Sequence, residues 1–368
     1  MAATRRNGGY GMPFNYEYEH KLRVGYIGAG EHSYRNILPC FQYTPIELMA
    51  LSDPDVDRGL AVARQFGARH FYPNHRALLA KEEMDAVFIV VGPDADGRPR
   101  YPELASEALR AGFHTWIGKP PCSNAGEVSM FTNACLAKHK YLGTGLKKMF
   151  VPAYLKVAEI IEDPAFGGAS SFSMRYPLSL PPEEKRQDTR AMSAFLEFVH
   201  PYSVLVRLFG ESRGFTYMRS EVSGGMVMSF RFSKGVVGTL HLTGGQSATS
   251  PLERLEVIGN GANVVVENGV RLIYYRPGGS RGEGGFGRAE SYFGPDDTAP
   301  IIWEPEFSLG QLYNKQLFLE GYVGCIQHFA QSLLEDKPPK HGNLVDILHI
   351  MTVYDRIRDG KENQWIRA

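Results

Sequence analysis

The first part of the chain alternates short apolar runs with helical segments. Runs such as LRVGYI and IELMALS are each followed by a turn and an amphipathic stretch, and this rhythm continues to about Gly145. Short runs that are apolar throughout are typical of parallel strands covered on both faces. The pattern predicts strands at 22–27, 46–52, 86–91 and 114–117, and helices at 33–42, 55–66, 101–111 and 124–139. It therefore indicates an α/β fold with a Rossmann-type, doubly wound parallel sheet.

The second part of the chain has a different pattern. After a helix predicted at 153–162, apolar and polar residues alternate in SSFSMRY, GMVMSFRF, GVVGTLHLTG, RLEVIG and NVVVEN. Such runs joined by short glycine turns predict an antiparallel sheet. The glycine- and charge-rich stretch at 278–300 predicts a long loop or arm, and two helices are expected at 322–334 and 344–358. This part is therefore expected to be an α+β domain with an open, mainly antiparallel sheet.

The length of 368 residues is enough for two cores. We expect an N-terminal tail at 1–20, a dinucleotide-binding domain at 21–148 and a substrate-binding and oligomerisation domain at 149–368. An open sheet leaves one broad face uncovered, and large exposed apolar patches usually mark interfaces. A homodimer or homotetramer is therefore expected.

Charge and composition exclude several classes of protein. Lys plus Arg equals Asp plus Glu, and no long basic run is present, so we expect no nucleic acid and no anionic membrane as a partner. No stretch reaches the ~18 to 20 apolar residues of a membrane span. The first residues lack the continuous apolar core of a signal peptide, so a cytoplasmic protein is expected. The four scattered cysteines form no CxxC pair, and the histidines show no metal-ligand spacing, so no metal is expected.

A glycine turn follows the first predicted strand. In VGYIGAGEHS, Gly28, Gly30 and Ser33 stand at the G-x-G-x-x-G positions that place a pyrophosphate on a helix N-terminus. Asp53 ends the second strand, where a carboxylate can bind the ribose diol; the alternative is an N-cap or turn aspartate at the start of the next helix. The motif favours NAD, while the nearby Arg58 keeps NADP open.

A lysine follows the last predicted parallel strand. In TWIGKPP, Lys119 stands at the carboxyl end of that strand, which is where ligands bind in doubly wound sheets. The alternative is an ordinary solvated surface lysine. The chain contains neither a G-x-S-x-G elbow nor a P-loop, so acyl transfer and ATP-driven phosphoryl transfer lack support.

Taken together, these motifs resemble the glucose-fructose oxidoreductase / inositol dehydrogenase (Gfo/Idh/MocA) family. The resemblance covers nearly the whole chain, in the order glycine turn, Asp53, the pair Pro93-Asp94, Lys119-Pro120, the LKKMFVPA segment, the EFVH helix and the closing helices. The chain departs from the family at Gly118, where the family has a glutamate before the lysine and proline.

The resemblance also implies site residues. In AFLEFVHPY, His200 falls on the family histidine that transfers a proton, whereas Leu196 and Phe198 replace the family aspartate and glycine, which leaves Glu197 as the neighbouring carboxylate. A core role for His200 and a buried structural role for Tyr202 are the alternatives. Expected cofactor contacts are Gly28, Gly30, Glu31, His32, Ser33, Asp53, Pro93, Asp94, Lys119 and Pro120; expected substrate contacts are Lys119, Lys147, Lys148, Glu197, His200 and Tyr202.

The family implies an NAD(P)-dependent oxidoreductase that moves a hydride to or from a secondary carbon of a sugar, sugar derivative or inositol-like substrate. His200 would transfer the hydroxyl proton, and Lys119 would stabilise the developing alkoxide. One alternative is an epimerase, lyase or glycosidase that uses NAD in a transient oxidation. Another is a non-catalytic NAD-binding sensor, which the missing family glutamate and aspartate motivate.

Overall fold

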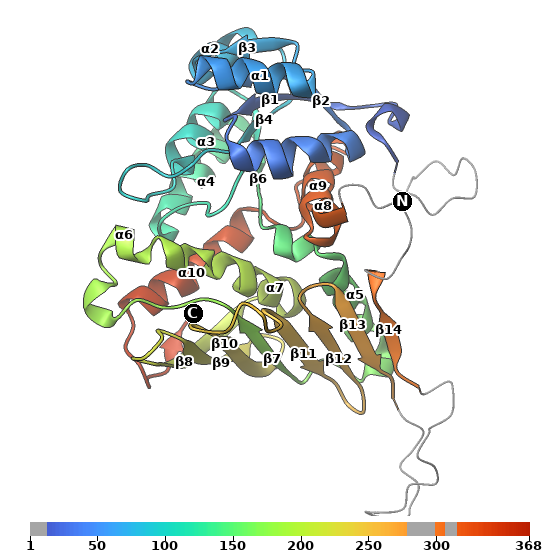
Figure 1. Ribbon diagram of the computed structural model, residues 1–368, viewed down its shortest axis with the longest axis vertical. Helices are drawn as coiled ribbons and strands as arrows, with labels where there is room; N and C mark the ends of the chain where they lie inside the picture. Colours follow the sequence, from blue (N-terminus) through green and yellow to red (C-terminus); the bar gives the residue numbers. More distant parts are fainter. Residues whose placement is uncertain (1–12, 278–298, 306–314) are drawn as a thin grey trace, which may run out of the picture.

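Two β-sheets dominate the computed structural model, which describes residues 13–277, 299–305 and 315–368. Figure 1 shows the first sheet in the upper, blue to cyan part of the molecule and the second sheet in the lower part, with helices between them. Most of the predicted N-terminal tail and nearly all of the predicted arm at 278–300 lie outside the described residues.

The first sheet is parallel throughout and has the strand order β3-β2-β1-β4-β5-β6. Its buried strands carry almost continuous apolar side chains, as expected for a sheet with helices on both faces. The predicted Rossmann-type sheet is confirmed. The strands are β1 Leu22–Ile27, β2 Ile46–Ser52, β3 His70–Tyr72, β4 Ala86–Ile89, β5 His114–Ile117 and β6 Leu142–Thr144; the helices are α1 Val56–Phe66, α2 His75–Lys81, α3 Tyr101–Arg110 and α4 Val128–Lys138.

Some predicted elements of this part were wrong in type or extent. The helix expected at 33–42 is a π-helix (η2, Ser33–Ile37) followed by a 3₁₀ helix (η3, Leu38–Tyr43). Pro39 explains the break, because proline lacks the backbone donor that an α-helix needs. The helix expected at 124–139 begins as a 3₁₀ turn (η4, Ala125–Glu127), and the strand expected to reach Val91 ends at Ile89.

The second sheet has nine strands in the order β14-β13-β12-β11-β7-β10-β9-β8-β15. Neighbouring strands are antiparallel except for β7 and β10, so the predicted mainly antiparallel sheet is confirmed. The strands are β7 Ser171–Tyr176, β8 Ser212–Arg219, β9 Met226–Phe232, β10 Val237–Leu242, β11 Arg254–Ile258, β12 Asn263–Glu267, β13 Arg271–Tyr275, β14 Ile301–Trp303 and β15 Ile366–Arg367.

Helices cover one face of this sheet and fill the space below the first sheet (Figure 1). Three helices, α5, α7 and α10, lie along the sheet, while α8 and α9 lie beside the first domain. Their bounds are α5 Pro152–Glu162, α6 Thr189–Met192, α7 Val199–Phe209, α8 Lys315–Leu319, α9 Tyr322–Leu334 and α10 Leu344–Asp359; short 3₁₀ turns are η1 Asn15–Glu17, η5 Lys147–Phe150, η6 Pro164–Phe166, η7 Glu183–Lys185 and η8 Ala194–Phe198.

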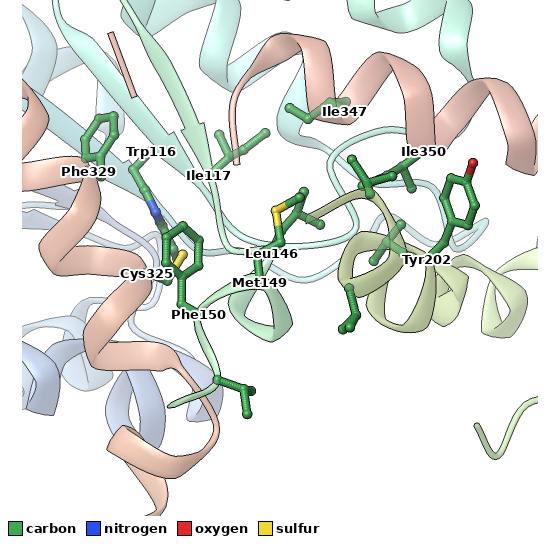
Figure 2. Close-up of a cluster of buried hydrophobic side chains, with 14 of the residues drawn as sticks. Trp116, Ile117, Leu146, Met149, Phe150, Tyr202, Cys325, Phe329, Ile347 and Ile350 are labelled. Carbon is green, nitrogen blue, oxygen red and sulfur yellow. The ribbon is translucent and has the colours of Figure 1, made fainter. Parts of the chain in front are cut away.

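The two parts of the molecule share an apolar junction. Figure 2 shows Trp116 and Ile117 of β5 beside Leu146 and Met149 of the η5 region, with side chains of α9 and α10 around them. Trp116, Ile117, Leu146 and Met149 are at most 2% exposed. The junction fixes the end of β5, and therefore the start of the Lys119 loop, against the helices of the second domain.

Candidate active site

The glycine turn after β1 forms one wall of a large cavity. Gly28 has a φ of +106°, and a Cβ there would lie 2.1 Å from the Val90 carbonyl oxygen, so only glycine fits. A Cβ on Gly30 would meet no atom within 4 Å, so the backbone there is open to a ligand. Both glycines line a cavity of about 480 Å³ together with Asp53, Arg58, Arg76 and Gly92. This shape suits the pyrophosphate and ribose of a dinucleotide.

Asp53 links the glycine turn to the start of α1. It is 4% exposed, and its carboxylate accepts hydrogen bonds from Ala29 N at 2.6 Å, Asp55 N at 2.9 Å and Arg58 Nη2 at 2.7 Å. The N-cap of α1 is Asp55 rather than Asp53, but the bond from Asp55 N fits the turn role that was the other alternative to a ribose contact. Arg58 also pairs with Asp55, so its charge is balanced by two carboxylates.

The remaining expected cofactor residues have varied surroundings. Ser33 is buried, and its hydroxyl donates to the Val90 carbonyl oxygen at 3.4 Å. Glu31 is exposed and pairs with Arg35. Pro93 and Asp94 are also exposed, just after the cavity-lining Gly92, and Asp94 accepts the Asp96 and Arg98 backbone N–H groups. These three residues are not among the residues that line the cavity.

Lys119 and His200 meet at one carboxylate, that of Glu197. Lys119, after β5, donates from Nζ to Glu197 Oε1 at 2.5 Å. His200, in the first turn of α7, has its Nε2 3.3 Å from Glu197 Oε2. Glu197 lies in η8, directly before α7, which places it three residues before His200 on the same face. Two groups 81 positions apart in sequence, one from each domain, are thus held on a single acceptor.

Burial and charge set the protonation states of this trio. His200 is 4% exposed, and burial, aided by the charge of Lys119, lowers the pKa of its imidazole to about 4. Burial alone would raise the pKa of Glu197, but the hydrogen bond from His200 and the charge of Lys119 outweigh it and lower that pKa to about 2. Near neutral pH the site therefore holds a neutral imidazole beside an ionised carboxylate.

Two more lysines lie beside the trio, and each is paired with a glutamate. Lys147 donates to Glu320 Oε2 and lies 4.1 Å from the centre of the Tyr322 ring. Lys148 donates to both carboxylate oxygens of Glu253, at 2.6 and 2.8 Å. Together with His32, Lys119 and Tyr322, Lys147 lines a small cavity at the domain junction. The charges of Lys119 and Lys147 add to burial in lowering the pKa of His32.

Gly118, the departure from the family pattern, is explained by its neighbour Tyr101. A Cβ at position 118 would lie 2.3 Å from the Tyr101 hydroxyl oxygen. That hydroxyl donates to the Val91 carbonyl oxygen at 3.1 Å, and Tyr101 is buried. The space that a side chain at 118 needs is occupied, so the partner carboxylate of Lys119 comes from Glu197 instead.

Tyr202, an expected substrate contact, is buried and hydrogen-bonded within the second domain. Its hydroxyl donates to Ser212 Oγ at 2.9 Å, and its ring stacks on Phe198 and packs on Phe230. It is 1% exposed, and Figure 2 shows its hydroxyl directed away from Leu146 and Met149. These contacts fit the buried structural role that was the alternative for Tyr202, and substrate contact by Tyr202 stays a prediction.

Several residues of the junction had no signal in the sequence. Glu253 precedes β11 and Glu320 follows α8, and both reach lysines that lie more than a hundred positions earlier. Tyr176 at the end of β7 belongs with them, because burial and the charges of Glu253, Glu197 and Glu320 raise its pKa. These residues come together only in the folded protein, where the sheet packs against the helices.

Within the described part of the chain, no group of three or more His, Cys, Asp or Glu residues is placed to hold a metal ion. Nor does any helix there have the length and apolar character needed to cross a membrane. All four cysteines are buried and free of disulfide bonds.

Comparisons with known proteins agree with the motifs. Residues 22–146 match the Gfo/Idh/MocA model, described as an oxidoreductase family with an NAD-binding Rossmann fold. A dTDP-3,4-didehydro-2,6-dideoxy-alpha-D-glucose 3-reductase from Streptomyces violaceoruber is 29% identical over 44% of this chain and 45% of its own length. A D-xylose 1-dehydrogenase (NADP(+)) from Haloferax volcanii is 26% identical over 42% of this chain and 47% of its own. The chain thus spans less than half the length of these curated relatives.

Solved structures match over nearly the whole chain. A dehydrogenase from Chromobacterium violaceum superposes with a TM-score of 0.74 at 19% identity, covering 92% of this chain and 94% of that one. An oxidoreductase from Agrobacterium radiobacter, solved with NAD+, L-tartaric acid and magnesium, has a TM-score of 0.73 at 14% identity and covers 94% and 98%. At these identities the likeness establishes the two-domain fold.

Proposed function

Since residues 22–146 belong to the Gfo/Idh/MocA oxidoreductase family, with its NAD-binding Rossmann fold, we propose that this protein oxidises a secondary alcohol, or reduces the matching ketone, of a sugar, sugar derivative or cyclitol. The observation that supports this proposal most is the meeting of Lys119 and His200 on the Glu197 carboxylate, at 2.5 and 3.3 Å. An ammonium and an imidazole that reach one acceptor can also reach one substrate oxygen.

The glycine turn and the cavity beside it fit a dinucleotide. Gly28 and Gly30 leave room for the pyrophosphate, and Asp53 lies where a ribose diol would bind. The nicotinamide ring, once bound, supplies the hydride acceptor or donor. The side chains of the protein transfer the hydroxyl proton and stabilise the charge on the substrate oxygen.

In oxidation, the substrate hydroxyl takes the place of Glu197 at His200 Nε2, and the neutral imidazole, with its own proton on Nδ1, accepts the hydroxyl proton at Nε2. The Glu197 carboxylate, whose Oε2 lies 3.3 Å from Nε2 in the free site, stabilises the imidazolium that forms. Lys119 Nζ donates to the same substrate oxygen and stabilises the negative charge that develops on it. In reduction, His200 returns the proton. Glu197 orients both groups and replaces the two carboxylates that the family pattern would place at positions 118 and 196.

The test is the rate of NAD reduction by the purified protein with myo-inositol, D-glucose and D-xylose. Lys119→Met and His200→Asn should each lower kcat by ~10² to 10⁴ while the affinity for NAD changes little. Because both groups act on one proton transfer, the double variant should lose much less than the product of the single losses. Lys156→Met and His349→Asn are matched controls away from this trio.

Three outcomes contradict the proposal. Near-normal turnover of the His200 variant rejects the histidine as base. Turnover of substrate to an epimer or an elimination product without net formation of reduced NAD identifies a transient oxidation instead. NAD binding with no turnover of any of the three compounds favours a sensor.

A further inference from the structure

Three lysine–glutamate pairs surround the domain junction, and in each pair the carboxylate is the more exposed partner. The side chains of Lys119 and Glu197 are 23% and 41% exposed, those of Lys147 and Glu320 are 11% and 37%, and those of Lys148 and Glu253 are 12% and 15%. The ammonium groups thus lie deeper than their partners, and two of the three carboxylates remain open to a ligand.

The three pairs belong to one cluster. The charges of Lys119 and Lys148 both act on His200, and those of Glu197, Glu253 and Glu320 all act on Tyr176. The small cavity at the junction is lined by Lys119 and Lys147 together. A ligand bound at this junction therefore lies in the electrostatic field of all three pairs.

Each lysine is held firmly by its partner. Glu253 accepts two hydrogen bonds from Lys148, and its Oε2 lies 3.4 Å from the hydroxyl oxygen of the buried Tyr154. Glu320 accepts from Lys147 and from Gln316, the latter at 2.8 Å. The hydrogen bond from Lys147 outweighs burial and lowers the pKa of Glu320, so this carboxylate is ionised at neutral pH. Each ammonium group of the cluster is thus already paired with one carboxylate, so the cluster offers an incoming anion no excess positive charge.

We propose that this arrangement selects an uncharged polyhydroxylated ring and rejects a ring that carries a carboxylate or phosphate near the reacting carbon. Exposed, ionised carboxylates accept hydrogen bonds from hydroxyl groups, whereas a second negative charge beside Glu197 and Glu320 is repelled. The inference rests on the proposed function for the position of the ring, and it narrows the substrate class to neutral sugars and cyclitols.

The experiment compares two probes that differ in one group. D-glucose and D-glucuronate are titrated separately into the NAD-bound full-length protein, and binding is followed by ligand-observed NMR. Glucose should bind at least about tenfold more tightly, since like charges at a recognition site cost a large part of the affinity. Glu320→Gln should narrow that ratio by several-fold, because it exposes the charge of Lys147 to the glucuronate. Glu159→Gln, in the exposed pair with Lys156, should leave the ratio unchanged.

The wild-type ratio is itself decisive, so the test does not depend on the variants folding. Equal or tighter binding of glucuronate overturns the inference, and so does a failure of glucose and of myo-inositol to bind at all. Binding of glucose without any reduction of NAD contradicts the proposed function but leaves this inference intact. Oxidation of glucuronate in preference to glucose contradicts this inference but leaves the proposed function intact.

Discussion

The space at Gly118 gives the sharpest energetic test of how this site departs from the Gfo/Idh/MocA pattern that it resembles. Gly118→Ala places a Cβ 2.3 Å from the Tyr101 hydroxyl oxygen and 3.0 Å from its Cζ. The buried Tyr101 ring must then shift, which costs about 1 to 3 kcal/mol for overpacking. Loss of the hydrogen bond from the Tyr101 hydroxyl to the Val91 carbonyl adds about 0.5 to 1.5 kcal/mol to the destabilisation. Alanine also restricts the unfolded chain more than glycine does, which stabilises the folded protein by about 0.4 to 1 kcal/mol. The net destabilisation should be about 0.5 to 4 kcal/mol.

The assay is equilibrium unfolding in urea, with Tyr101→Phe as the second change of a double-mutant cycle. Phenylalanine removes the oxygen at 2.3 Å and leaves the ring carbon at 3.0 Å. The cost of Gly118→Ala should therefore fall by about 1 kcal/mol in that background. Gly92→Ala is the control, since a Cβ there meets no atom within 4 Å. A Gly118→Ala protein within about 0.5 kcal/mol of the original, or additive changes, would refute the reasoning.

Three further predictions concern the cofactor, acid stability and assembly. NAD should bind more tightly than NADP in calorimetric titration, and Asp53→Ala should weaken NAD binding and narrow the preference; tighter NADP binding would show that Asp53 has been misinterpreted. Burial lowers the pKa of His114 to about 4 and of His341 to about 3, so the unfolded chain binds more protons below about pH 6.5. Stability should fall as the pH drops from about 6.5 toward 3, and equal urea midpoints at about pH 7 and about pH 5 would contradict this. The uncovered sheet face exposes Val227, Val237 and Ile258, so light scattering at micromolar concentration should give a dimer or tetramer mass, and a monomer mass would disprove it.

The parts of the fold with a strong local pattern could be predicted from the sequence. Strands β1, β2 and β5 have the predicted bounds because their apolar runs end at clear turns. Strands β3 and β6 and the helix α2 were missed, because elements of three to seven residues carry too few positions to show a period. The segment after the glycine turn was wrong for another reason. Its amphipathic pattern predicted one helix at 33–42, but Pro39 interrupts the helix there.

Some residues of the candidate site could likewise be predicted from the sequence, whereas the contacts between them could not. Lys119 and Asp53 could be proposed from the sequence because each follows a strand in a recognisable motif, and His200 could be proposed through its register with the family pattern. The joint contact of Glu197 with Lys119 and His200 depends on how η8 meets α7, and the tyrosine that fills the space at Gly118 lies 17 positions earlier in the chain. Such contacts follow from tertiary packing and produce no pattern in the spacing of residues along the sequence.

The central claim is that Lys119 and His200 act on the oxygen of a carbon that exchanges a hydride with NAD, and isotope transfer tests it most directly. The protein is incubated with NAD and with myo-inositol, D-glucose or D-xylose deuterated at the secondary carbinol positions, and the reduced nicotinamide is examined by mass spectrometry. At least one of the three should deliver deuterium to the nicotinamide, at a rate that falls ~100-fold or more in Lys119→Met and in His200→Asn. Absence of label from all three compounds while NAD is bound, or equal rates of labelling in the variants, would contradict the account.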